Sequence, residues 1–158
     1  SATGLTSASQ TEVIGAVAPD RLAFSTSPQT AVAGVCTGPL TVEARDAFAN
    51  PAAVGSATIV SLTGTAAATT TFYAAADTTC AGPTVSNVTI AMGGTSASFR
   101  LRNTAAGSST LTATGGGLTA ANQMLVINAG AAAKLAITLA EASPSSPSNA
   151  AWISCVAL

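Results

Sequence analysis

Apolar and polar side chains alternate along most of this chain. Leu40, Val42 and Ala44 alternate with Thr41, Glu43 and Arg45. A period of two residues is typical of half-buried strands in an antiparallel sheet, and pairs containing Gly or Pro separate the alternating stretches as turns do. The pattern predicts strands at 10–15, 20–26, 38–46, 56–63, 69–74, 85–92, 96–103, 108–114 and 121–128, with a further strand at 133–139.

Short strands at this regular spacing predict an all-β protein, either an antiparallel sandwich or a barrel. Alanine runs leave two places open to a helical alternative, Ala74–Asp77 and Ala129–Ala133. The glycines at 115–117 are followed by neither a lysine nor a helical pattern. They therefore predict a hinge or turn between strands rather than a phosphate-binding loop.

An internal repeat divides the chain. Residues 4–18 read GLTSASQTEVIGAVA and residues 117–131 read GLTAANQMLVINAGA, which places Gly117 over Gly4 at an offset of 113 residues. The match continues from 21–24 to 134–137, and a weaker match relates 33–36 to 152–155. Chance similarity within low-complexity sequence is the alternative, chiefly beyond residue 140. The repeat predicts a closing strand of a preceding unit or an N-terminal ribbon (1–17), a complete domain (18–130), and the start of a following unit or a C-terminal extension (131–158).

Several stretches resemble one family. They are RLAFSTSPQTAVAGVCTGPLTVEARDAFANP, TFYAAADTTC, VTIAMGGTSASFRLRNTAAGSSTLTATG and GLTAANQMLVINAG. They look like the immunoglobulin-like repeats of large bacterial surface proteins, similar to the domains of invasin and intimin. The resemblance implies an antiparallel immunoglobulin-like β-sandwich with Greek key connections, tandem arrays, and a location at the bacterial cell surface. The family usually has Gly where this chain has Ala49, so we expect a differently shaped turn there.

The three cysteines lack the CxxC spacing of a zinc or redox site. The resemblance, together with their position on two apolar segments, favours a disulfide between Cys36 and Cys80, which requires an oxidising compartment. The alternative is three free, buried thiols in a cytoplasmic protein. Cys155, which matches Cys36 in the repeat, is expected to be unpaired in this chain. It also begins a terminal CVAL, which has the form of a prenylation signal, but no polybasic run precedes it.

Composition excludes several functions. Charged residues are 7% of the chain and the formal net charge is −1, so no basic surface is expected to attract nucleic acid. No run of about 20 apolar residues predicts a membrane span, and no signal peptide is recognisable, which indicates a mature form or an internal fragment if the parent protein is exported. The chain has no histidine and only six carboxylates. We therefore expect no catalytic site, no cofactor and no enzymatic activity.

Two further motifs have ordinary structural interpretations. Asp46, Asn50 and Asp77 have the oxygen ligands that calcium prefers, but no DxDxDG-type loop is present, so we favour turn formation by Asp46 and Asn50 and expect no metal site. The sequence Asn87-Val88-Thr89 has the form of a glycosylation acceptor but lies within a predicted strand.

These observations lead to three hypotheses for an extracellular protein. The first is a structural or adhesive repeat that acts as a stalk or fibre segment and contacts neighbouring repeats. The second is a module that binds a glycan or a protein through its loops, for which Phe48, Tyr73 and Trp152 are the candidate exposed aromatics. The third is a self-assembling filament subunit, in which 4–17 or 133–139 pairs with a sheet edge in the same chain or in another molecule.

Overall fold

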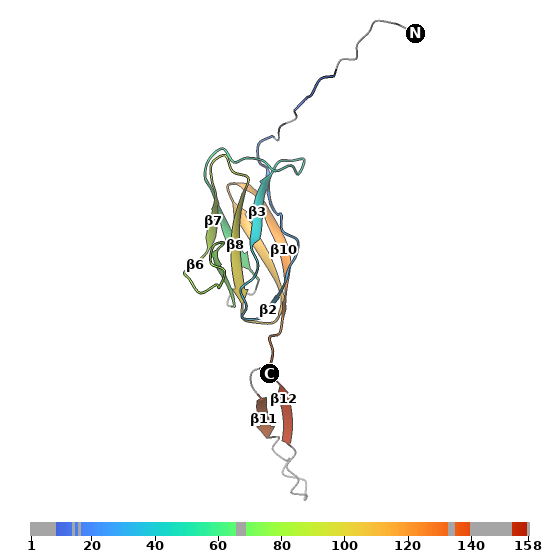
Figure 1. Cartoon of the computed structure of the whole chain (residues 1–158), viewed down its shortest axis with the longest axis vertical. Coiled ribbons are helices and arrows are strands. Elements are labelled where there is room, and N and C mark those ends of the chain that lie inside the picture. Colours follow the sequence, from blue (N-terminus) through green and yellow to red (C-terminus); the bar gives the residue numbers. More distant parts are fainter. Residues whose placement is uncertain are drawn as a thin grey trace, which may run out of the picture.

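The computed structural model describes residues 9–13, 15, 17–65 and 69–132, together with the backbones of 135–139 and 153–157 (Figure 1). These residues form strands and connecting loops, so the predicted all-β class is confirmed. None of the described residues lies in a helix, and hence no helix there is long and apolar enough to cross a membrane. The strands are β1 (Arg21–Phe24), β2 (Thr30–Val32), β3 (Leu40–Arg45), β4 (Thr58–Gly64), β5 (Thr70–Ala74), β6 (Thr84–Val85), β7 (Asn87–Ile90), β8 (Ser96–Asn103), β9 (Gly107–Gly115), β10 (Leu118–Asn128), β11 (Leu135–Leu139) and β12 (Ile153–Ala157).

Ten strands form one mixed sheet that curls until it nearly closes into a barrel. The strand order is β6-β5-β8-β3-β1-β10-β9-β4-β7, and β2 lies beside β10. The neighbours β1 and β10 are joined by a single register pair, Arg21 with Thr119. We call β6-β5-β8-β3-β1 the first half of the sheet, and β10-β9-β4-β7 with β2 the second half. The expectation of a purely antiparallel sheet is wrong, because β10 runs parallel to both β1 and β2.

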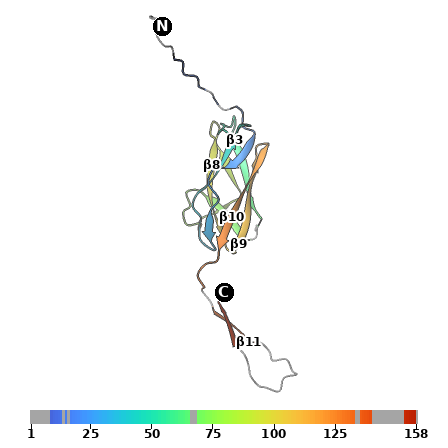
Figure 2. The same cartoon turned by 90° about the vertical axis from the view of Figure 1, so that its right-hand side faces the viewer.

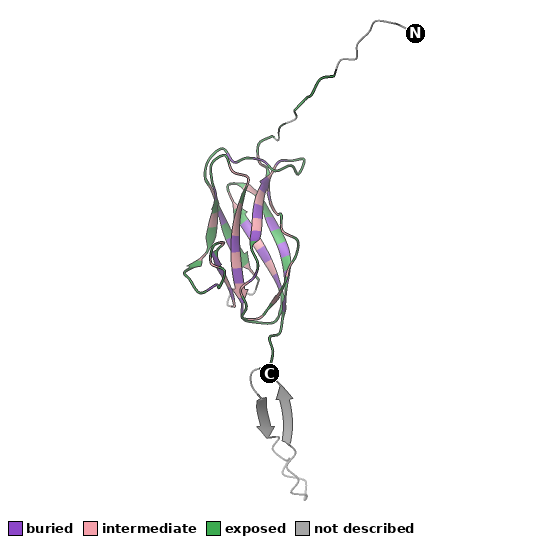
Figure 3. Ribbon diagram, viewed as in Figure 1, coloured by how far each residue is buried: buried purple, intermediate pink, exposed green. Residues whose placement is uncertain are grey.

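The hydrophobic core lies between the two halves (Figure 3). Phe99 on β8 is 1% exposed, and its ring meets those of Phe24 and Phe72 edge to face at centroid distances of 6.4 and 5.8 Å. Leu111 and Leu125 of the second half belong to the same core cluster. Removal of these apolar side chains from water is the main favourable term in folding. The alternation in the sequence thus marks which face of each strand packs inward.

The first and last strands of the ten-stranded sheet, β1 and β10, run in the same direction, which fixes where the chain enters and leaves the module. Arg21 at the start of β1 pairs with Thr119 near the start of β10, whereas Val32 at the end of β2 pairs with Asn128 at the end of β10. Nine residue steps of strand separate those two points on β10, or about 30 Å. The chain therefore enters at one pole of the module and leaves at the other (Figure 2).

The predicted turn at 115–117 is present. Gly116 and Gly117 have φ of 62° and 69° and join β9 to β10 as a two-residue hairpin loop. Positive φ at both positions is the requirement of a type I′ turn, and glycine adopts it without steric cost. A Cβ on Gly115 would collide with the carbonyl oxygen of Ile59 on the neighbouring strand β4.

Other segments differ from the prediction. The strand expected at 10–15 is absent from its described residues, and Val13 is 88% exposed because no sheet covers it. The strand expected at 85–92 is divided, since β6 pairs with β5 whereas β7 pairs with β4. Ala74 ends β5, and the other described residues of the two alanine runs lie in turns and loops. The segment 133–139 supplies β11, which pairs with β12 of the same chain, and neither β12 nor β2 was predicted.

The two halves differ in charge. The strands of the first half contain Arg21, Glu43, Arg45, Arg100 and Arg102. The strands of the second half contain no charged residue, and their outward positions hold mainly Ser, Thr and Asn. Two of these polar side chains are hydrogen-bonded to each other: the hydroxyl of Thr112 on β9 donates to Oδ1 of Asn122 on β10 at 2.7 Å.

Candidate functional site

Cys36 and Cys80 form a disulfide against β8. Their Cα atoms are 5.4 Å apart, and the bond joins the segment after β2 to the loop after β5. Cys36 forms an isolated bridge with Arg102, and the sulfur of Cys80 lies 3.6 Å from the carbonyl oxygen of Leu101. Cys80 is fully buried and has a φ of 52°. The bond thus connects two loops to the same central strand. Cys155 lies in β12, and its side chain is outside the described residues.

Asp77 shapes the loop that presents Cys80. Its carboxylate accepts hydrogen bonds from the backbone N–H of Gly82 at 2.8 Å, from the N–H of Thr79 at 3.1 Å and from the hydroxyl of Thr79 at 3.0 Å. The bond from Gly82 is the largest cause of the lowered pKa of Asp77, because hydrogen bonds to a carboxylate favour its charged form. This loop therefore uses its acidic group for folding.

Asp46 shapes the turn after β3 in the same manner. It is 1% exposed and accepts hydrogen bonds from the backbone N–H groups of Phe48 and Asn50, both at 2.9 Å, and from that of Val17 at 3.3 Å. Burial raises the pKa of Asp46, but the hydrogen bonds from Asn50, Phe48 and Val17 outweigh it and the net pKa is lowered. Ala49 has a φ of 68°. This turn therefore adopts at alanine a conformation that favours glycine.

The calcium candidates are not brought together. Asp46 and Asn50 bond to each other within one turn, whereas Asp77 serves the loop before Cys80. No group of three or more His, Cys, Asp or Glu side chains that could hold a metal occurs among the described residues.

The two candidate aromatics that the structure describes, Phe48 and Tyr73, differ in their exposure. Phe48 is 77% exposed in the turn after β3, but Tyr73 is only 3% exposed, so the expectation that it is a surface aromatic is wrong. The guanidinium of Arg102 lies over its ring, 5.8 Å from the centroid. Thr71 donates a hydrogen bond to its hydroxyl at 3.1 Å. Trp152 lies outside the described residues.

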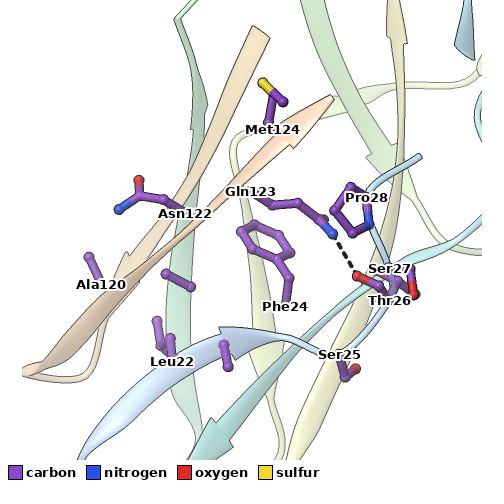
Figure 4. A pocket seen from close by; sticks show the side chains of 12 residues that line it. Leu22, Phe24, Ser25, Thr26, Ser27, Pro28, Ala120, Asn122, Gln123 and Met124 are labelled. Carbon is purple, nitrogen blue, oxygen red and sulfur yellow. Dashed lines mark hydrogen bonds between the residues drawn. The ribbon is translucent and has the colours of Figure 1, made fainter. Parts of the chain in front are cut away.

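An open groove of about 600 Å³ lies where β1 and β10 separate (Figure 4). After the single pair of Arg21 with Thr119, the chain of β1 moves away from β10 and continues into the segment that leads to β2. It pairs with β10 again only through β2, from Val126 onward. The walls are residues 22–28 and 120–124. The described residues that line the groove include no acidic or basic side chain.

Gln123 spans the inside of this groove (Figure 4). Its Nε2 donates a hydrogen bond to the carbonyl oxygen of Thr26 at 2.6 Å. Its side chain is nearly buried, at 8% exposure, and its Oε1 accepts no hydrogen bond within the described part of the molecule. The amide therefore ties β10 to the segment between β1 and β2 and leaves one buried acceptor without a partner among the described residues.

The sequence analysis did not select Gln123 or Thr26. One signal was available: Gln123 occupies the inward parity of β10 together with Ala121, Leu125 and Ile127, all of which are apolar. A single polar residue in an apolar inward series identifies a position that requires a partner. Thr26 contributes only its backbone carbonyl, which carries no mark in the sequence.

The fold and site together define a disulfide-containing, all-β module whose polar groups shape loops and one uncharged groove. No protein-family model matches the sequence, and no curated protein matches it. Several solved structures are similar. A glycosyl hydrolase family 2 member from Bacteroides cellulosilyticus matches with a TM-score of 0.51 and 12% identity, over 72% of this chain and 15% of that one. A β-glycosidase from Bacteroides vulgatus matches with a TM-score of 0.50 and 15% identity, over 70% of this chain and 14% of that one.

Domains 4 and 5 of the S-layer protein SbsC match with a TM-score of 0.46 and 16% identity, over 72% of this chain and 47% of that one. The chain thus spans less than half the length of each of these three structures. At such low identity, the two glycosidase matches show a common β fold alone.

Proposed function

We propose that this chain is a structural, non-catalytic module of an extracellular bacterial surface protein, used as a stalk or fibre segment. The parallel pairing of β10 with β1 and β2 carries the proposal, because it places the entry and exit of the chain at opposite poles. Modules of this kind join end to end without reversal of the chain. Repetition then produces length, which is what a stalk needs.

The proposal includes an immunoglobulin-like sandwich. The two halves of the sheet are joined by only one register pair between β1 and β10, so they correspond to two sheets that enclose the core. The first strand is divided between them, with β1 against β3 and β2 against β10. The connection from β3 to β4 and that from β8 to β9 both cross from one half to the other, as Greek key connections do. This arrangement supports the resemblance to invasin-type repeats.

The disulfide supports an extracellular location. Disulfides persist in oxidising compartments and are rare in the cytosol. The absence of histidine from the sequence and of ionisable groups from the groove supports a non-catalytic role.

Surface exposure on the source cells tests the proposal. An antibody raised against this module should label intact cells, and an external protease should remove the label while a cytoplasmic marker survives. An immunoblot should show a polypeptide far longer than 158 residues, as a tandem array requires. Labelling that occurs only after lysis contradicts the surface location, and a single band near the size of this chain contradicts the array.

A ligand-binding module is the second candidate, and the open groove between β1 and β10 favours it. The groove lies between two stretches of extended chain and has uncharged walls, which suits a short peptide in strand conformation or a glycan. NMR titration of the isotope-labelled chain with soluble glycans and extended peptides tests this role. Shifts confined to 22–28 and 120–124 support it, and unchanged spectra at millimolar ligand contradict it.

A further inference from the structure

In a stalk, tension acts on a module where the chain enters it, before β1, and where the chain leaves it, after β10. The contact between β2 and β10 lies on the path between these two points. Thr30, Ala31 and Val32 pair in register with Val126, Ile127 and Asn128. Backbone hydrogen bonds extend this contact at both ends, from Val126 N to Gln29 O at 3.2 Å and from Ala33 N to Asn128 O at 2.9 Å.

The strand directions decide how these bonds are loaded. Because β2 and β10 are parallel and their outer ends leave at opposite poles, tension slides one strand lengthwise past the other. All bonds of the contact then resist together. A pair of strands pulled apart from a common end instead loses its bonds one at a time. The four pairs between β1 and β3 are also loaded lengthwise, because β3 is held by β8.

The disulfide gives tension a short path once β1 and β2 are released. The next fixed point in the chain is Cys36, which is bonded to Cys80 across a Cα distance of 5.4 Å. Tension passes through the sulfur atoms, and the 44-residue separation between the two cysteines is never stretched. The strands β3, β4 and β5 all lie within this closed loop.

We propose that the module is a mechanical element, in which the parallel β2–β10 contact resists tension and the Cys36–Cys80 bond shields β3, β4 and β5 from extension. This inference rests on the proposed function, since it requires the chain to be pulled by its two ends. It assigns the disulfide a role beyond equilibrium stability, namely to limit how far a ruptured module lengthens.

Single-molecule pulling of the full chain in two geometries tests the β2–β10 contact. In the first geometry, handles are attached at residues 1 and 158. In the second, the handles are at residue 1 and at exposed Ala120, introduced through an unnatural amino acid so that no cysteine is added. Both geometries use the chain that carries the replaced residue 120, so the equilibrium stability is matched. The terminal geometry should give the higher rupture force, because Ala120 lies at the entry pole and opens the β1–β10 joint from its end. An equal or lower force in the terminal geometry overturns this part of the proposal.

The rupture length tests the disulfide. In the oxidised chain, tension extends only the stretches from Arg21 to Cys36 and from Cys80 to Asn128, so the distance between Arg21 and Asn128 should increase by about 190 Å. If the whole chain between these two residues were extended, the increase would be about 340 Å. Reduction should therefore add about 150 Å, and Cys155→Ser should add nothing. If the reduced chain does not fold, the oxidised length alone decides between the two values. An oxidised length near 340 Å overturns the proposal, while the surface-labelling result for the proposed function is unaffected.

Discussion

The side-chain amide of Gln123 donates a hydrogen bond to the backbone carbonyl of Thr26 at 2.6 Å, and so ties β10 to the segment between β1 and β2. We predict that Gln123→Glu destabilises the fold at neutral pH by about 1–3 kcal/mol, because a buried carboxylate then faces a carbonyl without a proton between them. Burial raises the folded-state pKa of the new carboxyl, so the penalty should appear as pH rises through the usual value of about 4.3. Urea unfolding at pH 4 and pH 7 measures this difference.

Gln123→Met is the control, since it has similar length and no titratable group. Its unfolding free energy, relative to the unmodified chain, should be the same at both pH values. A Gln123→Glu variant with no additional loss at pH 7 would show that the groove is wetter than the 8% exposure of Gln123 indicates.

Loss of the Cys36–Cys80 disulfide should lower the unfolding free energy by about 4 kcal/mol, because the bond closes a long loop and restricts the unfolded chain. Guanidinium unfolding of a double serine variant measures the loss. Cys155→Ser, outside this loop, should leave the midpoint unchanged. Non-reducing peptide mapping should recover Cys36 joined to Cys80, and free alkylation of both thiols in unfolded, unreduced protein is incompatible with the bond.

Ala49→Gly should stabilise the module by about 1 kcal/mol. Ala49 has a φ of 68°, a conformation that costs an L-residue more than it costs glycine. Ala53→Gly is the matched control, because Ala53 is also an exposed loop alanine but is not among the residues with positive φ. Thermal unfolding should show a higher midpoint for the first variant and an equal or lower midpoint for the second. A lower midpoint for Ala49→Gly contradicts the turn geometry.

Asp46→Asn should weaken the fold in a pH-dependent manner. The folded-state pKa of Asp46 is lowered by hydrogen bonds from Asn50, Phe48 and Val17 against the opposing effect of burial. Its stabilising effect is therefore present above the ordinary value of 3.8 and is lost as pH falls through the folded-state pKa. The stability difference between the two proteins should be constant near neutral pH and should shrink on acidification. Asp77→Asn, which removes the other carboxylate with a lowered pKa, should show the same pH dependence. A stability difference between Asp46→Asn and the unmodified chain that widens in acid contradicts the lowered pKa of Asp46.

Native trypsin should leave the large sheet intact. Arg45, Arg100 and Arg102 all lie in paired strands, and Arg100 also donates hydrogen bonds to the carbonyls of Ala75 and Thr37. Cleavage at these sites requires local opening of the sheet. Mass spectrometry of a time course should find Arg45, Arg100 and Arg102 uncut in the native chain, whereas the reduced and unfolded chain should be cut at every site. Rapid native cleavage after Arg100 or Arg102 contradicts the assignment of β8.

Strands with a clear period of two could be predicted from the sequence. Leu40–Arg45 and Ser96–Asn103 bury every second side chain and differ from the prediction by at most two residues at either end. Shorter or interrupted strands could not be. Thr30–Val32 has three residues, too few to show a period, and its parallel partner β10 is almost a hundred residues away. The strand prediction at 10–15 fails because alternation shows only that one face of a strand would be apolar. It does not show that another strand is available to cover that face.

The candidate site was predictable to a smaller extent. The cysteine pair followed from two cysteines on apolar segments and from a family resemblance. Tyr73 was misjudged because burial of an outward-facing aromatic depends on a side chain from another strand, in this case Arg102 of β8. The groove arises where β1 ends and the chain moves across to β2, and this is a property of the topology rather than of any local motif.

Because charge is uneven between the two halves of the sheet, salt affects contacts made by one half and not those made by the other. Dissolved salt screens interactions between charges, so it weakens contacts made by the arginine-bearing strands β1, β3 and β8. The outward Ser, Thr and Asn side chains of β4, β9 and β10 have no charge to screen and no proton to lose. Contacts between neighbouring modules through this uncharged face would therefore have the same strength at low salt, at high salt and at mildly acidic pH.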